Sequence, residues 1–529
     1  MAQEVRMKQN WVKRTLIVVF WIAVWQIASM AMGSGLILAS PLDTVQALCV
    51  QVAKPTFWSI VWFSFARIVG GFLASFLLAL ALGALAHRFT FLRDLLLPVV
   101  TVFKTVPVVC LIVLLLIWFG SKNVSGIAVF LVVFPGIYFA VLEAGDHLDP
   151  KIAQMLHVHG VSAWRRLFVS VWPQTLPFLQ STCKVVVGMS WKAGVAAELI
   201  GIPAGSIGER IYQSKLLLET ADLFAWTLVI IAVSYVCEKA FLALLRNSGK
   251  WSMHAAVPKR PSAETVQRAE QDARSTRAGT VQRAAQDAES VRAGIRRRAG
   301  SSRRMNSEAS PIVFHDVVKR FAVKDAETST GSGDGGTRTD TGARKDADVE
   351  RTVIDHLSAT IPAGARVCLT DPSGTGKTTL LNLACGLTTP TEGSVEVPTT
   401  SSAVFQESRL IEPLSAWENV ALTAGRYRDA AEIEALLASV LPVESLGQPV
   451  SELSGGMRRR VELIRALATP SQAVVLDEPF ASLDAASHAT ACKVLAANLE
   501  GRTLLVATHD PHDVEALCAT VLELPKPRS

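Results

Sequence analysis

The chain has 529 residues, half of them hydrophobic, and a formal net charge of +6. This length predicts several domains rather than one. The positive charge does not indicate nucleic-acid binding, because the basic residues cluster beside apolar segments and in one polar stretch, as is typical of the cytoplasmic flanks of membrane proteins. The eight cysteines stand singly, without a Cys-x-x-Cys pair, which argues against a disulfide framework or a zinc site.

The first 250 residues contain six apolar stretches long enough to cross a membrane, for which about 20 helical residues suffice. They cover residues 16–33, 58–86, 95–118, 124–144, 176–200 and 223–246. The first stretch follows several basic residues but lacks a small-x-small cleavage site, so we expect an uncleaved signal anchor. The positive charges place the N-terminus and the end of the sixth stretch in the cytoplasm. We therefore predict an all-α polytopic membrane domain of about six transmembrane helices over residues 1–250.

Four ionisable residues interrupt these stretches, namely Arg67, Lys104, Lys192 and Glu198. Charges inside a membrane are costly and usually face the interior of a helix bundle or a wet cavity. A cationic lining would suit an anionic substrate. Structural pairing, for example of Lys192 with Glu198, is the alternative interpretation.

The long loop near residues 145–175 is predicted to be cytoplasmic and to form short amphipathic helices, which Gly160 interrupts and Pro173 ends. The spacing of this glycine and proline resembles the coupling loop of bacterial ABC importer permeases. In their pattern a Glu-Ala-Ala triplet precedes the glycine, and this chain has Gln154, Met155 and Leu156 there.

Residues 251–310 form a basic linker that contains a 15-residue near-repeat, at 265–279 and 280–294. The repeat has too few apolar residues to build a core, so we expect a partly helical tether that lies near anionic membrane lipid. A second polar stretch, near residues 323–350, is predicted to be a flexible insert in the domain that covers residues 311–529.

Residues 371–379 lie between a short apolar strand and a predicted helix, which is the setting of a phosphate-binding loop. Backbone N–H groups and the helix N-terminus would bind the polyphosphate of ATP. Lys377 would neutralise the β- and γ-phosphates, and the Thr378 hydroxyl would bind Mg²⁺. The residues predicted to bind ATP here are Ser373, Gly374, Thr375, Gly376, Lys377, Thr378 and Thr379.

Asp371 stands at the first position of this loop, where glycine is usual. A side chain there occupies a position that favours unusual dihedral angles, and its carboxylate would lie near phosphates that repel it. At a partly screened separation this repulsion would cost on the order of 1–2 kcal/mol. We expect ATP binding to survive, and a weakened site is the alternative.

Three further short motifs complete the predicted site for ATP hydrolysis. Asp477 ends an apolar strand and would hold Mg²⁺ through water, together with Thr378 and Gln406. Glu478 is the candidate general base for the attacking water. Gln406 would sense the metal and the water, and His509, which follows another strand, would contact the γ-phosphate. Each residue alone is more often structural, and only the set predicts catalysis.

The run Leu453-Ser-Gly-Gly-Met457 and the basic helix after it resemble the signature of ABC ATPases. In that family the signature reaches the γ-phosphate bound to the other subunit. The resemblance therefore implies a composite site and two motors, in a homodimer or in a heterodimer with another permease–ATPase chain. The residues that it implies for the partner's nucleotide are Ser454, Gly455, Gly456 and Asp484. Phe321 is the candidate for stacking on adenine, Phe314 is a second candidate, and the alternative for both is a place in the core.

The segments 404–410 and 414–420 resemble the ATPases of the nitrate/sulfonate/taurine importer group, and Ser40-Pro-Leu and Ile117-Trp-Phe-Gly120 fit their permeases. The resemblance implies a multidomain chain in which an α/β P-loop ABC ATPase domain with a helical subdomain follows the permease. It implies ATP-driven import of a small anion or of a vitamin precursor such as a thiamine pyrimidine. It also implies an extracytoplasmic substrate-binding protein and the inner membrane of a prokaryote, with the ATPase in the cytoplasm.

Two alternatives remain at this point. An exporter half-transporter would also fuse a permease to an ATPase, but the short loops and the coupling loop argue against it. A regulatory chain that binds ATP and hydrolyses it weakly is suggested by Asp371. The retention of Lys377, Glu478 and His509 argues against that second alternative.

Overall fold

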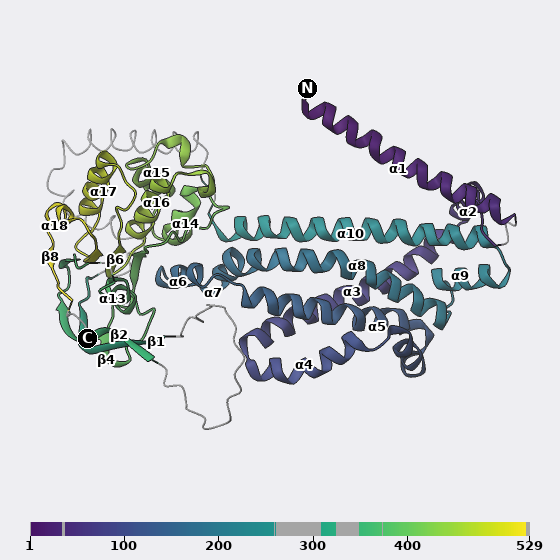
Figure 1. Cartoon of the computed structure of the whole chain (residues 1–529), viewed down its shortest axis with the longest axis horizontal. Helices are drawn as coiled ribbons and strands as arrows, with labels where there is room; N and C mark the ends of the chain where they lie inside the picture. Colours follow the sequence, from purple (N-terminus) through teal and green to yellow (C-terminus); the bar gives the residue numbers. More distant parts are fainter. Residues whose placement is uncertain are drawn as a thin grey trace, which may run out of the picture. The chain divides into compact units, whose positions relative to one another are not determined.

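The computed structural model describes residues 2–33, 37–258, 260, 308–323, 349–372 and 374–524 (Figure 1). The chain forms two compact units. One, the membrane unit, comprises Met1–Leu148 and Val171–Ser252, and the other, the ATPase unit, comprises Asp149–Ser170 and Met253–Ser529. The predicted linker repeats and most of the predicted polar insert fall on 261–307 and 324–348, which lie outside the described residues.

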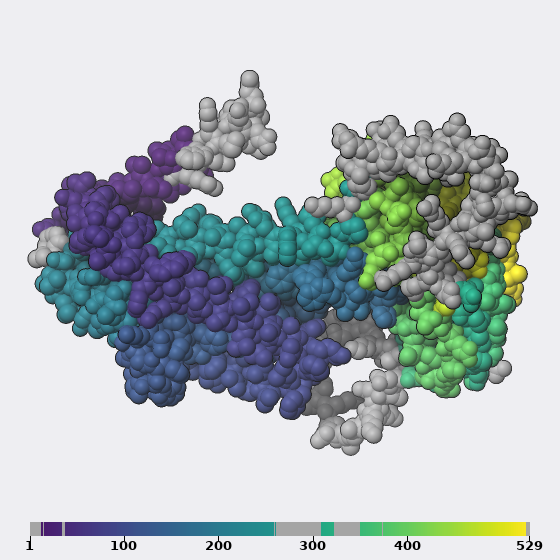
Figure 2. Space-filling view, turned by 180° about the vertical axis from the view of Figure 1, so that it is seen from behind, coloured from purple at the N-terminus to yellow at the C-terminus, as the bar shows by residue number. Residues whose placement is uncertain are grey.

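The membrane unit is all-helical. Its helices are α1 (Ala2–Met32), α2 (Pro41–Val52), α3 (Phe57–Arg88), α4 (Thr90–Thr105), α5 (Val108–Asp146), α8 (Trp172–Gly201), α9 (Ile207–Leu216) and α10 (Thr220–Ala256). Within the described residues, α3, α5, α10 and the part Thr15–Met32 of α1 are long and apolar enough to cross a membrane. The long helix α10 is the teal rod in Figure 2.

The predicted spans differ from these helices in their boundaries. The predicted span 95–118 is divided between α4 and the start of α5, and the span 124–144 lies in the second part of α5. The break between the two parts is at Gly120, whose φ of 74° and ψ of 169° are not helical. Because glycine lacks a Cβ atom, it can adopt this positive φ without strain. The predicted span 176–200 lies in α8.

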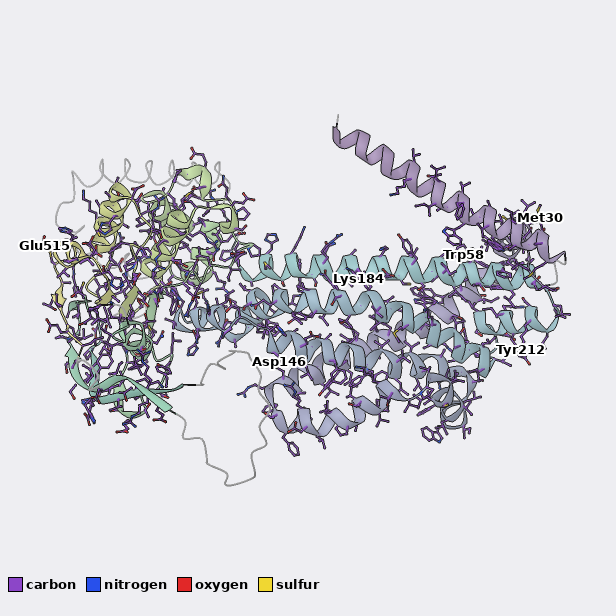
Figure 3. The ribbon with its side chains drawn as sticks, viewed as in Figure 1. Met30, Trp58, Asp146, Lys184, Tyr212 and Glu515 are labelled. Atoms are coloured by element: carbon purple, nitrogen blue, oxygen red, sulfur yellow. The ribbon has the colours of Figure 1, made fainter. Side chains whose placement is uncertain are left out.

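Helices α3, α5 and α8 surround the core of the membrane unit, which includes Ile68, Phe72 and Leu179. At one point α3 and α5 approach so closely that a Cβ atom on Gly71 would lie 2.2 Å from the carbonyl oxygen of Gly126. Small residues allow such contacts between membrane helices, whose association depends on close packing. Many large apolar side chains point outward instead, and Trp58, labelled in Figure 3, is 66% exposed. Such a surface suits contact with lipid or with another membrane helix.

Glu198 is fully buried between α3 and α9. Its Oε2 accepts hydrogen bonds from the Ser64 hydroxyl at 2.7 Å and from the Gly208 N–H at 3.3 Å. Lys192 is exposed. The suggested pairing of Lys192 with Glu198 was therefore wrong, because Glu198 is held by a hydroxyl and a backbone amide.

The ATPase unit contains two sheets. An antiparallel sheet of order β2-β1-β4 is built from β1 (Ile312–Val323), β2 (Val349–Ile361) and β4 (Glu392–Glu396). A parallel sheet of order β5-β6-β7-β3-β8 is built from β3 (Arg366–Leu369), β5 (Ser401–Val404), β6 (Ala473–Asp477), β7 (Thr503–Ala507) and β8 (Thr520–Val521). Every residue of β6 and β7 is buried, as expected for parallel strands that are covered on both faces.

Helices pack around these sheets. They are α13 (Lys377–Ala384), α14 (Ala416–Ala424), α15 (Ala430–Ala438), α16 (Gly455–Ala468), α17 (Ala485–Ala497) and α18 (Pro511–Ala516), with short 3₁₀ turns at Val443–Ser445 and Val450–Glu452. Helices α14, α15 and α16 share an apolar core around Trp417 and form the helical subdomain.

The predicted coupling loop belongs to the ATPase unit. It forms α6 (Pro150–Val158), α7 (Ala163–Arg166) and a π-helical turn (Leu167–Val171). Asp149 caps α6 by accepting a hydrogen bond from the Lys151 N–H, and Gly160 breaks the segment with a φ of 66°. Met155 and Leu156 are fully buried in an apolar cluster that includes Phe405. Pro173, expected to end these helices, lies in the first turn of α8 instead.

We predict that Gly71→Ala disrupts the contact between α3 and α5, because the added methyl group meets backbone that cannot move aside. Gly70→Ala is the matched control, since no atom lies within 4 Å of a Cβ there and replacing a helical glycine stabilises by about 1 kcal/mol. Thermal unfolding in detergent should show a lower Tm for Gly71→Ala and an unchanged or higher Tm for Gly70→Ala. Equal Tm values for the two variants would contradict this packing.

Candidate functional site

The parallel sheet brings the predicted site residues together at one edge. The phosphate loop follows β3, Gln406 follows β5, Asp477 ends β6 with Glu478 after it, and His509 follows β7. The carboxyl ends of parallel strands meet at the same edge, which is where ligands bind in open α/β sheets. A cavity of about 320 Å³ lies there. It is lined by Arg351, Val353, Gly374, Gly376, Lys377, Thr378, Thr379, Gln406, Asp477, Glu478 and His509.

The phosphate loop holds its lysine against its own backbone. The Lys377 Nζ donates hydrogen bonds to the carbonyl oxygens of Asp371 and Pro372 and lies 3.5 Å from the His509 Nδ1. Gly376, with a φ of 98°, is the N-cap residue directly before α13 and permits the sharp turn into the helix. Ser373, predicted to bind ATP, lies outside the described residues. Thr375 is described but is not among the lining residues, and its hydroxyl donates to the Pro372 carbonyl at 2.9 Å.

The side chains of Glu478 and His509 both line the cavity and contact each other. The His509 Nε2 lies 2.7 Å from the Glu478 Oε1, so the imidazole can orient the carboxylate that would accept a proton from water. Glu478 has a φ of 49°, an uncommon conformation for a residue other than glycine, and its N–H donates to the Ala507 carbonyl at 2.9 Å. This backbone bond ties the end of β6 to the end of β7 and thereby sets the separation of the two side chains.

Oxygen donors that suit a hard cation line the same cavity. Asp477 is 5% exposed, and burial raises the pKa of its carboxyl group, while a hydrogen bond with the Thr378 side chain acts in the opposite direction. With the carboxamide of Gln406, these residues offer a hydroxyl, a carboxylate and an amide oxygen. Mg²⁺ prefers such a set when phosphate and water complete its shell, so the residues fit that ion.

The side chain of Asp371 does not line the cavity. Its Oδ2 accepts a hydrogen bond from the Leu524 N–H at 3.2 Å, in the C-terminal segment. Asp371 is also absent from the described residues with positive φ. The backbone strain expected at Asp371 is therefore absent. The expected phosphate repulsion stays a prediction, and the carboxylate has a backbone partner outside the cavity lining.

Arg459 of α16 is a positioning residue that sequence reasoning missed. Its guanidinium is buried and donates hydrogen bonds to the carbonyl oxygens of Phe405, Asp477 and Glu478. It also pairs with Glu462 at 3.0 Å, where both side chains are more than nine-tenths buried. The Arg459 guanidinium thus connects the segment before Gln406 to the strand end that carries Asp477 and Glu478. A buried arginine of this kind is stable because its donors are satisfied by several acceptors.

Four predicted nucleotide-binding residues do not line the cavity of their own chain. Ser454 caps α16 by accepting a hydrogen bond from the Met457 N–H at 3.3 Å, and Gly455 and Gly456 begin that helix. Asp484 caps α17 by accepting one from the Ser487 N–H at 2.7 Å, and this bond is the main cause that lowers the pKa of Asp484. The helix N-terminus at Ser454 offers N–H groups to an anion outside this cavity.

Phe321 is 44% exposed and is also absent from the cavity lining. It pairs across the sheet with Arg351, which does line the cavity. Directly opposed residues of antiparallel strands project to the same face, so the two side chains lie beside each other. Arg351 was not predicted, because its position follows from the strand register and from no motif.

Two family models match the chain. Residues 71–247 match the binding-protein-dependent transport system inner membrane component, and residues 354–481 match the ABC transporter model. Over 176 residues the chain is 41% identical to the aliphatic sulfonates import ATP-binding protein SsuB 2 of Frankia alni, covering 71% of that protein and 32% of this chain. The chain belongs to the ABC transporters. It joins an importer-type permease and an ABC ATPase, so it hydrolyses ATP to drive transport.

A second curated relative and a solved structure are also similar to the ATPase part of the chain. The aliphatic sulfonates import ATP-binding protein SsuB 1 of Nocardia farcinica is 39% identical over 193 residues, which are 78% of that protein and 36% of this chain. Among solved structures, the dimeric ATP-binding cassette in a post-hydrolysis state with ADP and phosphate is 23% identical, with a TM-score of 0.34. That match covers 41% of this chain and 99% of the cassette.

We predict that Asp371→Asn leaves the affinity for ATP unchanged within about twofold. Asparagine keeps an acceptor for the Leu524 N–H and removes only the charge, which lies away from the cavity. Lys377→Ala is the comparison and should weaken ATP binding by at least about tenfold, or ~1.4 kcal/mol. Binding of a fluorescent ATP analogue to the purified chain measures both. If Asp371→Asn bound ATP about tenfold more tightly, the Asp371 carboxylate would repel the phosphates as first expected from the sequence.

Proposed function

We propose that two copies of this chain, or one copy with a similar permease–ATPase chain, import a small sulfonate-type anion across the inner membrane of a prokaryote. ATP and Mg²⁺ bind at the cavity, with Thr378, Asp477 and Gln406 around the ion. Glu478 accepts the proton of the attacking water, and His509 orients this water. An extracytoplasmic protein delivers the substrate.

The observation that carries this proposal is the docking of the predicted coupling loop beside Gln406. The Arg409 guanidinium donates to the Gln154 Oε1 at 3.0 Å and stacks over the Phe405 ring at 3.5 Å. Lys151 pairs with Glu407, and this contact is the main cause that lowers the pKa of Glu407. Gln406, between these residues, lines the cavity. A shift of Gln406 when nucleotide binds or is hydrolysed would therefore reach residues 149–170 directly.

A second path joins the docking surface to the catalytic acids. The Arg409 N–H donates to the Glu462 Oε1 at 2.7 Å, and Glu462 pairs with Arg459, which holds the carbonyl oxygens of Asp477 and Glu478. The Arg459–Glu462 pair and the bond from Arg459 to the Asp477 carbonyl are buried, where hydrogen bonds to charged groups are strong. The backbone around the hydrolysis site and the docking surface are thus parts of one network.

The dimer is supported by where the signature residues lie. Ser454, Gly455 and Gly456 form a helix N-terminus with free access to an anion but are not part of their own chain's cavity. A second chain would use them on its γ-phosphate, as the family resemblance implies. Import is supported by the binding-protein-dependent type of the permease and by the sulfonate-import relatives, whose printed function suggests the substrate class. A vitamin precursor is the alternative substrate.

Glu478→Gln should lower the rate of phosphate release in liposomes by about 100-fold or more, because general-base catalysis contributes about that much. The variant should still bind ATP, since the Gln side chain keeps the size of the carboxylate. Glu515→Gln, an exposed residue of α18 labelled in Figure 3, is the control and should hydrolyse ATP at the wild-type rate. If Glu478→Gln hydrolysed ATP at the wild-type rate, Glu478 would not be the general base.

Reversing the ion pair between α6 and the Gln406 loop tests the coupling. Lys151→Glu and Glu407→Lys should each reduce uptake of radiolabelled ethanesulfonate by cells of the source organism that carry the variant in place of the native chain. The double variant restores opposite charges and should recover most of the uptake, because the attraction depends on sign and not on which side carries it. A double variant as defective as the singles would show that this pair does not contribute. No uptake by the wild type would exclude this substrate.

A further inference from the structure

A histidine, a cysteine and an aspartate converge on one face of the ATPase unit, away from the ATP cavity. His488 and Cys492 lie one turn apart on α17, and Asp513 lies on α18. The His488 Nε2 is 2.8 Å from the Asp513 Oδ1, and its Nδ1 is 3.9 Å from the Cys492 Sγ. One donor atom from each residue lies within 4.8 Å of the other two. No other trio of such side chains gathers in this way within the residues that the structure describes.

The surroundings of this cluster are those of a built site. Cys492 and Asp513 are 4% and 1% exposed, whereas the side chain of His488 is 25% exposed and faces the solvent. The Phe480 ring packs edge-on against the His488 imidazole at 4.9 Å and restricts its rotation. The Asp513 Oδ2 accepts a hydrogen bond from the Thr508 hydroxyl, which leaves the other carboxylate oxygen directed at the cluster. Such outer hydrogen bonds are what orient metal ligands in proteins.

An ion pair between His488 and Asp513 alone would explain two of the three residues. It does not explain why the Cys492 thiol lies at the opposite ring nitrogen, four residues along the same helix. Zinc-class ions bind the thiolate form of cysteine, so a bound ion would displace the thiol proton of Cys492.

We propose that His488, Cys492 and Asp513 bind a thiophilic divalent cation of the zinc class. One imidazole nitrogen, one thiolate and one carboxylate oxygen would supply three ligands, and water would complete a tetrahedral shell on the open side at His488. Ligand atoms around such an ion lie about 3.3–3.8 Å apart. The thiol and the carboxylate now contact opposite ring nitrogens, so binding requires them to converge on one nitrogen from separations within 4.8 Å. The sequence argued against a zinc site because no two cysteines stand close together in it. The proposed cluster needs only one cysteine, and its third ligand comes from another helix.

The site would act on the loop that carries His509. The Thr508 hydroxyl binds Asp513 and also accepts a hydrogen bond from the Asp510 N–H at 3.1 Å, so Asp513 holds the turn on both sides of His509. A cation on the other oxygen of Asp513 would fix this turn more firmly. Metal occupancy and the position of His509 at the ATP cavity are therefore linked through one carboxylate.

The test is a Cd²⁺ titration of the full-length chain in detergent, without nucleotide, after treatment with a chelator and its removal. A thiolate-to-cadmium charge-transfer absorption should saturate at one equivalent per chain, a readout that the all-oxygen ATP site cannot produce. Cys492→Ala should abolish the absorption, and His488→Gln should weaken Cd²⁺ binding by about 10–100-fold. Cys518→Ser removes an exposed thiol of the same unit and should keep the absorption. Each variant is first checked for an unchanged Tm without metal and for ATP binding.

Two results would overturn the proposal. One is a wild-type chain with no charge-transfer absorption at saturating Cd²⁺. The other is a Cys492→Ala chain that keeps the wild-type absorption. If Cys492→Ala does not fold, His488→Gln decides alone, because its side chain is partly exposed and its loss removes a ligand without opening a buried cavity. Unchanged Cd²⁺ affinity in that variant would equally rule out the site.

Discussion

The interaction on which the rest of the molecule depends is the packing of α6 into the ATPase unit. Residues 149–170 connect two membrane helices in sequence, yet Met155 and Leu156 are fully buried with Phe405 and its neighbours. Apolar burial supplies the affinity, and the polar contacts of Arg409 set the register. Because apolar packing is close and resists deformation, we expect a movement of the Gln406 loop to carry α6 with it.

The same logic explains the two buried charges behind the site. Arg459 and Glu462 could have been apolar residues at no loss of packing, and buried ion pairs often contribute little net stability. What an apolar pair could not do is bond to three carbonyl oxygens on two separate strand ends. Their value is therefore in the placement of the backbone, because Asp477 and Glu478, which we propose bind the metal ion and accept a proton, both line one cavity. The buried pair therefore matters for how the backbone is oriented more than for the free energy of unfolding.

Sequence motifs predicted the ATP cavity well because each motif follows a strand of one parallel sheet, and the topology of such a sheet brings strand ends together. They did not predict Arg351, which depends on strand register, or Arg459, which depends on how α16 packs across β6. Asp371 is a residue that the motif did single out, but whose contacts the motif did not predict. Its residue type suggested repulsion of phosphate, but residue type did not predict the contact of its side chain with the Leu524 N–H. Apolar length located the long helices of the membrane unit, of which four among the described residues meet the criteria for a span, but it did not predict the break at Gly120, which reflects local dihedral angles.

His509 is the point at which separate parts of the ATPase unit meet. Its ring contacts Glu478 and approaches Lys377, and the residue before it bonds to Asp513, which belongs to the His488–Cys492 cluster. In the function that we propose, nucleotide would act on His509 from the cavity, and a cation at the cluster would act on its backbone through Asp513 and Thr508. A histidine that orients water needs an accurate position, so two constraints would be more effective than either alone. The proposed cation site would then give the hydrolysis step a second control that uses none of the residues lining the ATP cavity.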